Sequence, residues 1–156
     1  MNRRSVLRLS AMTAFLLSAI TLARAAEDTE GVDAASKAFY AALSVMDDGS
    51  AMSRVWAHVP YATLVGPRSK SIIVGWDAIN AYWPESNKRF SKRTITLLDR
   101  HVHVNGNLAW EIGREGGTGV AADGSESTFK WFVTNVYERI DGHWLIVSHH
   151  VQPMPQ

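Results

Sequence analysis

The 156-residue sequence contains no cysteine. Disulfide bonds, thiolate catalysis and cysteine-ligated metal sites are therefore excluded as sources of stability or chemistry. The sequence has only one long apolar run, residues 9–23, which lies near the amino terminus and is interrupted by Ser and Thr. It is shorter than the roughly 20 apolar residues that a membrane-spanning helix needs. The rest of the chain must fold around an ordinary hydrophobic core.

Residues 1–25 have the features of a signal peptide. Arg3, Arg4 and Arg8 make a basic start, the apolar run follows, and Ala23-Arg24-Ala25 is an A-x-A cleavage site. The basic start also resembles, in part, the twin-arginine pattern of bacteria. We expect cleavage after residue 25 and export to the periplasm or the medium, by the Tat or the Sec route. An uncleaved membrane anchor is the alternative.

The mature chain has only a small net charge. Four of the 16 basic residues and none of the 15 acidic ones lie in residues 1–25, which leaves 12 basic against 15 acidic side chains, a net charge of −3. A slightly acidic domain is poorly suited to nucleic acids or to anionic membranes, so neither is an expected partner once the signal is removed. Residues 26–156 are enough for one domain with a sizeable core.

Hydrophobic periodicity predicts helices first and long strands afterwards. Helices are predicted over residues 27–48, 51–57 and 75–87, and Ser50 is expected to cap the second. Short strands are predicted over 61–65 and 71–74. Long strands are predicted over 93–104 and 108–114 and in the terminal hairpin, 129–153. Asn105-Gly106 and Asp141-Gly142 are favoured hairpin turns. Gly116–Ser127 is polar and rich in glycine, so a loop is expected there. This order is typical of an α+β fold in which helices pack on one face of a curved, mainly antiparallel six-stranded sheet and enclose a pocket.

The terminal hairpin is apolar on both faces, and a sheet of this kind has to be covered on both sides. Val133, Asn135 and Tyr137 share one face of its first strand, and His149 shares a face of the second strand with Val151. We expect helices over one face and a second copy of the chain, in a homodimer, over the other. The face assigned to that partner carries Phe132, Val136, Trp144 and Ile146.

Five short strings follow one another in the order and at the spacing of a known superfamily. They are Phe39-Tyr40-Ala41-Ala42-Leu43, Trp56-Ala57-His58, Gly75-Trp76-Asp77-Ala78-Ile79, His101-Val102-His103-Val104-Asn105-Gly106 and Thr134-Asn135-Val136-Tyr137. Together they make the mature chain resemble the NTF2-like superfamily, which includes SnoaL-like proteins, ketosteroid isomerases and the association domain of calcium/calmodulin-dependent kinase II. The resemblance implies a cone-shaped fold with an internal pocket. It does not imply one function, because the superfamily hosts isomerases, cyclases, dehydratases, binding modules and oligomerisation hubs.

The resemblance suggests two kinds of pocket. An isomerase would pair a Tyr on the first helix, near Tyr40, with an Asp after the first strand, but Leu64–Pro67 contains no acid. The kinase association domain holds a small carboxylate with arginines on three strands. Two of those positions fall here on Asn135 and Val151, and the third falls near Gly116, on a strand face that includes Arg114.

We therefore expect a pocket for a small polar or anionic organic ligand, lined by five side chains: Tyr40, Trp110, Arg114, Asn135 and His149. Arg114 and His149 would hold the charged end of the ligand. Alternation along the strands places Glu111 and Glu138 on the opposite face, so the pocket is expected to contain no strand carboxylate.

Two other functions stay open. One is an enzyme of the isomerase, cyclase or dehydratase type that uses the same pocket, with His149 as acid/base and Tyr40 or Asn135 as a polarising donor; the sequence does not decide whether catalysis occurs. The other is an oligomerisation module without a ligand. No cofactor is expected. No metal is expected either, because His101 and His103 share a strand face but no carboxylate completes a recognisable ligand set.

Overall fold

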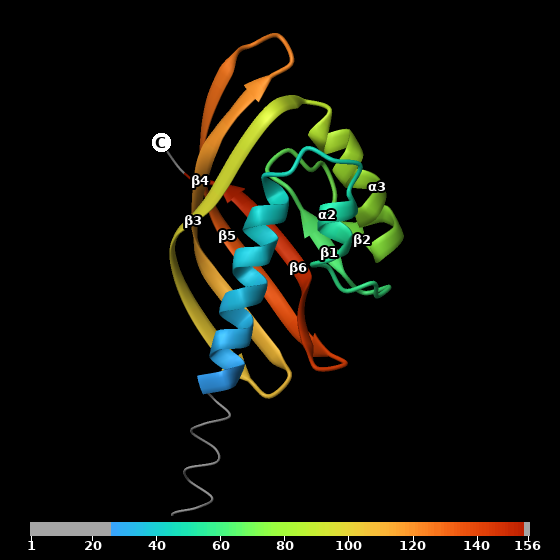
Figure 1. The fold of residues 1–156 in the computed structure, drawn as a ribbon, viewed down its shortest axis with the longest axis vertical. Coiled ribbons are helices and arrows are strands. Elements are labelled where there is room, and N and C mark those ends of the chain that lie inside the picture. Colours follow the sequence, from blue (N-terminus) through green and yellow to red (C-terminus); the bar gives the residue numbers. More distant parts are fainter. Residues whose placement is uncertain (1–25, 155–156) are drawn as a thin grey trace, which may run out of the picture.

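A computed structural model describes residues 26–154, so the predicted signal peptide lies outside the described residues (Figure 1). The chain forms an N-terminal helix (residues 26–43), two smaller helices and one six-stranded sheet of order β2-β1-β6-β5-β4-β3. The smaller elements are α2 (Ser50–Ser53), β1 (Thr63–Val65), β2 (Ile73–Val74) and α3 (Trp76–Asn87). The long strands are β3 (Phe90–Asn105), β4 (Leu108–Ala121), β5 (Glu126–Ile140) and β6 (His143–Pro153). All neighbouring strands are antiparallel except β1 and β6. The predicted α+β cone is confirmed.

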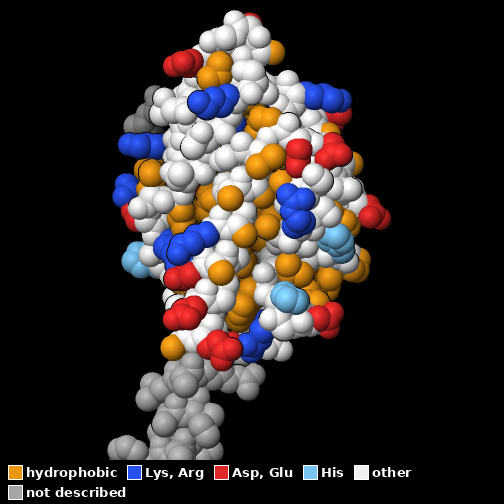
Figure 2. Space-filling model, in the orientation of Figure 1, with side chains coloured by type: hydrophobic (Ala, Val, Ile, Leu, Met, Phe, Trp, Pro, Cys, Tyr) orange, Lys and Arg blue, Asp and Glu red, His pale blue; other side chains and the backbone are white. Residues whose placement is uncertain are grey.

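The helices cover one face of the curved sheet (Figure 1). The N-terminal helix buries Val32, Phe39 and Leu43 against the sheet, at the helical spacing seen in the sequence. Figure 2 shows the outside of this face, where hydrophobic side chains lie in small patches among Lys, Arg, Asp and Glu. Within residues 26–154, no helix has the length and apolar character needed to cross a membrane.

The N-terminal helix ends at residue 43, five residues earlier than predicted. Asp47 belongs to the start of the next helix, because its carboxylate accepts hydrogen bonds from the backbone N–H groups of Gly49 (2.9 Å) and Ala51 (2.8 Å). It also accepts one from the Ser50 hydroxyl at 2.8 Å. Asp47 therefore satisfies the free donors at the start of α2, and the predicted capping role of Ser50 is wrong.

The expected loop over Gly116–Ser127 is also wrong, because β4 continues to Ala121 and β5 already begins at Glu126. The glycines of β4 are needed for close approach to β3. A Cβ atom on Gly117 would lie 1.8 Å from the Thr94 carbonyl oxygen, and one on Gly113 would lie 2.1 Å from that of Asp99. Glycine in a strand interior allows this contact and the bend that accompanies it.

A β-bulge in β6 changes which residues face the helices. Val136 pairs with Ser148 but Tyr137 pairs with Ile146, so Val147 is an extra residue. Ile146 is consequently fully buried in the core. Trp144 also lies on the helix side, where a Cβ atom on Gly31 would come within 2.6 Å of its ring. The prediction that Trp144 and Ile146 lie on the outer face is wrong.

Candidate functional site

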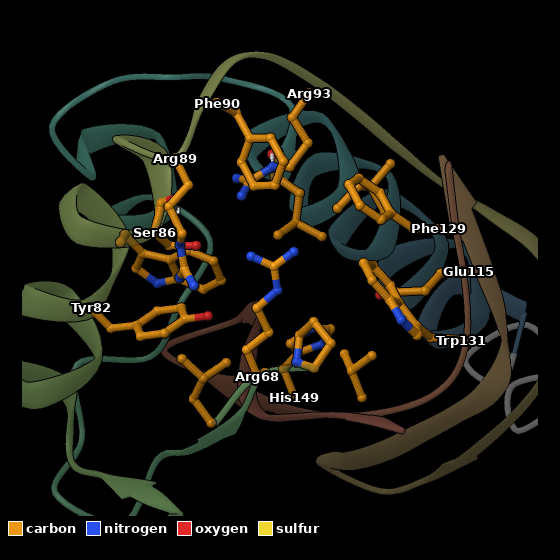
Figure 3. A pocket seen from close by; sticks show the side chains of 17 residues that line it. Arg68, Tyr82, Ser86, Arg89, Phe90, Arg93, Glu115, Phe129, Trp131 and His149 are labelled. Carbon is orange, nitrogen blue, oxygen red and sulfur yellow. Dashed lines mark hydrogen bonds between the residues drawn. The ribbon is translucent and has the colours of Figure 1, made fainter. Parts of the chain in front are cut away.

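The candidate site is a cavity of about 60 Å³ between α3, the β1–β2 segment and the concave face of the long strands (Figure 3). Aromatic rings form much of its wall. Phe129 stacks on Trp131 with ring centroids 4.8 Å apart, and Phe90 meets Phe129 edge to face at 5.8 Å. Tyr82 and Trp83 of α3 form a second edge-to-face pair. The wall therefore offers an apolar surface to the body of a small molecule.

Three arginines from different segments also line the cavity: Arg68, Arg89 and Arg93. Arg93 is buried, and its guanidinium donates to the Leu43 carbonyl oxygen (2.8 Å) and to Asn87 Oδ1 (3.0 Å). Arg68 and Arg89 are exposed, and neither forms an ion pair with another described residue. Figure 3 shows the Arg68 guanidinium pointing into the middle of the lining side chains.

Glu115 of β4 is the one carboxyl group among the lining residues, and only 1% of it is exposed. The Tyr40 hydroxyl donates a hydrogen bond to its Oε2 atom at 3.1 Å. Burial raises the pKa of Glu115 to about 7, although the Tyr40 hydrogen bond and the charge of Arg93 act in the opposite direction. The cavity thus contains a carboxyl group that changes its charge near neutral pH.

A chain of buried hydrogen bonds connects Glu115 with His149 on the other side of the cavity. His149 Nδ1 lies 2.7 Å from Asn135 Oδ1, and Asn135 Nδ2 donates to the Tyr40 hydroxyl at 3.3 Å. Tyr40 in turn donates to Glu115. Tyr40, Asn135 and His149, which the sequence placed in one pocket, therefore meet in one cluster.

Glu111 is fully buried and is hydrogen-bonded to Asn135, in the middle of this series of hydrogen bonds. Its Oε1 accepts hydrogen bonds from Asn135 Nδ2 (2.9 Å) and from the Tyr137 hydroxyl (3.2 Å), and its Oε2 lies 2.7 Å from Arg100 Nη1. Arg100 also pairs with Asp33 on the N-terminal helix. A buried carboxylate needs this set of donors and a counter-charge, so Glu111 holds the sheet and the helix together.

His149 lines the cavity as a neutral ring. Because Asn135 uses its amide NH₂ toward Glu111 and Tyr40, its Oδ1 is an acceptor, and this places the His149 proton on Nδ1. Burial lowers the pKa of His149 to about 3. Its Nε2 atom is therefore unprotonated and weakly basic at neutral pH. The role of His149 as an acid/base stays a prediction.

Of the five predicted lining residues, only His149 lines the cavity. Tyr40 and Asn135 do not line it themselves but are hydrogen-bonded to the lining residues Glu115 and His149. Arg114 and Trp110 lie away from the cavity. The Arg114 side chain is 48% exposed, and its Nε donates to Asp99 Oδ2 at 2.8 Å. Trp110 is 37% exposed and packs on the His103 ring. The register explains the error, because Asn135 pairs with Glu111 and residues directly opposite each other share a face.

The same register places two glutamates on the concave face of the sheet, where the sequence analysis expected no strand carboxylate. Glu111, Gly113 and Glu115 alternate along the concave face, so the expectation that Glu111 points away is wrong. The spacing of the two glutamates, four residues apart in a strand, was the available signal that they share a face.

A second, more open hollow of about 540 Å³ lies between the N-terminal helix and β3. Its charged side chains are largely paired, Asp33 with Arg100 and Asp99 with Arg114. It therefore offers a ligand less free charge than the cavity. Among residues 26–154, no group of three or more His, Asp or Glu side chains is arranged to hold a metal ion.

The curved six-stranded sheet, the helix across its concave face and the enclosed cavity define a protein of the NTF2-like cone fold. The chain belongs to the SnoaL-like domain family, whose model matches residues 32–155. Solved structures of this fold include proteins described as a proposed dehydratase and a proposed aromatic ring hydroxylase. Among curated proteins, none matches the sequence significantly.

Solved structures agree with this assignment. A proposed dehydratase of the NTF2-like family from Streptomyces avermitilis is 23% identical and superimposes with a TM-score of 0.74, covering 83% of this chain and 99% of that one. An NTF2-like superfamily protein from Salmonella enterica is 24% identical, with a TM-score of 0.70 over 83% and 90% of the two chains. A proposed calcium/calmodulin-dependent protein kinase II association domain from Xanthomonas campestris is 23% identical, with a TM-score of 0.64 over 80% and 84%. At these identities the likeness shows the fold alone.

Proposed function

We propose that this protein is an exported binding protein whose cavity takes a small organic anion with an apolar body. One observation carries the proposal: Arg68, Arg89 and Arg93 surround a cavity whose only carboxyl group, Glu115, is partly neutral near pH 7. The cavity is therefore net positive. A carboxylate ligand would supply the negative charge that Arg68 and Arg89 lack within the described part of the chain.

The anion is held differently from the sequence expectation. Arg68 and Arg89 replace Arg114 as the charged contacts, and they come from the β1–β2 loop and the turn after α3. His149 and Glu115 lie deeper, beside Val151 and the aromatic wall. We place the carboxylate of the ligand at the arginines and its apolar body against the rings.

The small volume limits the ligand. A cavity of about 60 Å³ holds a few waters or a compact organic acid. The flexible, exposed side chain of Arg68 leaves room for a somewhat larger molecule if it turns outward. Short-chain carboxylic acids are therefore the first probes, ahead of sterol-like compounds.

A thermal-shift screen tests this function with short-chain carboxylic acids and their neutral amides. At a ligand concentration 100 times Kd, binding adds about 2.7 kcal/mol, which raises the melting temperature by on the order of 10 °C in a domain of this size. Arg68→Gln and Arg89→Gln should each weaken binding about 10-fold or more, since a charged hydrogen bond is worth about 1.5–3 kcal/mol. Arg114→Gln, outside the cavity, is the matched control and should respond like the wild type.

Other outcomes separate the competing functions. Stabilisation by neutral compounds alone, or an equal response of all three variants, would contradict anion binding. If no small molecule stabilises the protein, the oligomerisation module without a ligand becomes the better interpretation.

A further inference from the structure

We infer that His149 determines the specificity of the cavity, because its free ring nitrogen, Nε2, accepts a hydrogen bond from a hydroxyl group of the ligand. The ligand class is thereby narrowed to small hydroxy-carboxylic acids. This inference rests on the proposed function, since the same molecule is held at the arginines by its carboxylate.

The hydrogen bonding of the His149 ring carries the inference. Its Nδ1 atom donates the single ring proton to Asn135 Oδ1 at 2.7 Å, so Nε2 carries a lone pair and can only accept. Phe39 packs against the ring with centroids 4.9 Å apart, and Leu64 is the strand partner of His149 in β1. These neighbours supply apolar contact, and no residue in the described part of the chain donates a hydrogen bond to Nε2.

The cavity is the space from which a donor can reach Nε2. His149 is one of its lining residues, and Figure 3 shows the ring among the side chains that surround it. The side-chain nitrogen and oxygen atoms of residues 26–154 that are both sealed from solvent and unpaired are the indole nitrogens of Trp56 and Trp83. The unpaired Nε2 atom is not among them, so it is open to a molecule in the cavity. A hydroxyl group placed there would supply the donor that this largely buried ring lacks.

The charge of the cavity selects a hydroxyl group over an ammonium group as this donor. The lining side chains include the guanidinium groups of Arg68, Arg89 and Arg93. They are offset by one carboxyl group, that of Glu115, whose pKa of about 7 leaves it partly neutral. The ammonium group of an amino acid would add a further positive charge to this set, whereas a hydroxyl group donates the same hydrogen bond without charge.

A series of four-carbon acids tests this selectivity. Isothermal titration calorimetry at pH 7 compares butanoate with its 2-, 3- and 4-hydroxy derivatives and with its 2-, 3- and 4-amino derivatives. The series keeps the carboxylate and the chain length constant while the position and the charge of the donor change. We expect at least one hydroxy isomer to bind the wild type about 10-fold tighter than butanoate, because a site that bonds a hydroxyl group discriminates against the analogue without it. The amino derivatives should bind no tighter than butanoate.

Variants of His149 separate recognition of the hydroxyl group from support of the fold. In His149→Asn, the side-chain NH₂ group can still donate to Asn135, but no acceptor remains at the position of Nε2. The affinity for the preferred hydroxy isomer should therefore fall about 10-fold more than the affinity for butanoate, whereas a merely structural role would lower both equally. His149→Gln, whose amide oxygen can reach the position of Nε2, should recover part of the preference. Arg114→Gln, outside the cavity, should keep it in full.

The failures of this inference and of the proposed function can be told apart. Hydroxy isomers that bind no tighter than butanoate, or a preference that His149→Asn retains, would overturn the inference and leave anion binding intact. An amino derivative that binds as tightly as the best hydroxy isomer would also overturn it, because the donor would then not be selected by charge. If no acid of the series binds, the proposed function is wrong and the inference with it.

Discussion

The side-chain oxygen of Asn135 lies 2.7 Å from Nδ1 of His149, and neither residue is more than 4% exposed. The amide of Asn135 is fully used, since its NH₂ group donates to Tyr40 and to Glu111. One side chain from β5 thus joins the N-terminal helix, β4 and β6 beneath the cavity. A polar group in this position fixes the cluster in a single arrangement, because any other would leave a buried group unpaired.

Replacing Asn135 should therefore destabilise the whole domain. Asn135→Leu has a similar size but leaves His149 Nδ1 without a partner, and it removes one hydrogen bond each from Glu111 and Tyr40. We expect the free energy of unfolding to fall by about 3 kcal/mol, since each unsatisfied buried group costs about 1–3 kcal/mol. Urea unfolding measures the loss. Thr134→Val, one residue away on the outer face, is the control and should change stability by less than about 1 kcal/mol; a comparable small change in Asn135→Leu would refute the structural role of the cluster.

The raised pKa of Glu115 predicts a pH-dependent stability. The folded-state pKa of Glu115 is about 7, above the ordinary 4.5. The neutral carboxyl group therefore adds to the free energy of unfolding in full below pH 4.5, and this addition is lost as the pH rises through 7. The Glu115→Gln variant cannot ionise and should lack this loss. Between pH 4.5 and pH 8, the free energy of unfolding of the wild type should fall by on the order of 3 kcal/mol relative to that of the variant. A difference that does not vary with pH would show that Glu115 ionises normally in the folded protein.

The convex face of the sheet predicts a homodimer. Trp110, Ile112 and Phe132 are 37–50% exposed there, although all three are large and apolar. Apolar patches of this kind usually mark an interface. We expect light scattering to give twice the mass of one chain, and Ile112→Asp or Phe132→Asp to give a monomer or insoluble protein. Ile72→Asp, at an exposed isoleucine outside β4 and β5, should leave the dimer unchanged. A monomeric wild type would rule the dimer out.

Export predicts a mature protein that begins at Ala26. Amino-terminal sequencing of material from the periplasm or the medium measures this directly. Changing Arg3 and Arg4 together to Lys should block export if the twin-arginine route is used and should leave the Sec route working. Met1 retained on protein from the cytoplasm would contradict the signal peptide.

Local rules predicted much of the fold. Asp141-Gly142 was read as a two-residue hairpin turn, and both residues have the positive φ angles, 50° and 83°, that such a turn requires. The alternation of Val133, Asn135 and Tyr137 correctly placed all three inside, because a strand without a bulge keeps a strict two-residue period. The sequence failed where a strand departs from that period or where its register was unknown. Val147 is the extra residue that turns Ile146 inward, and the register of β4 placed Glu115 inside and Arg114 outside.

The sequence by itself determined the cone fold, the family, and the presence of Tyr40, Asn135 and His149 in one cluster. The fold follows from turn dipeptides and periodicity, which are properties of short stretches of chain. The family and the shared location of the three side chains follow from the resemblance of short strings to the NTF2-like superfamily. Only the tertiary structure decided the charge of the cavity. Arg68, Arg89 and Glu115 lie in three separate segments that meet when α3 and the β1–β2 loop fold over the bent glycine-rich strands. Their proximity depends on strand register and bending, which are set by packing between distant segments and leave no local pattern to read.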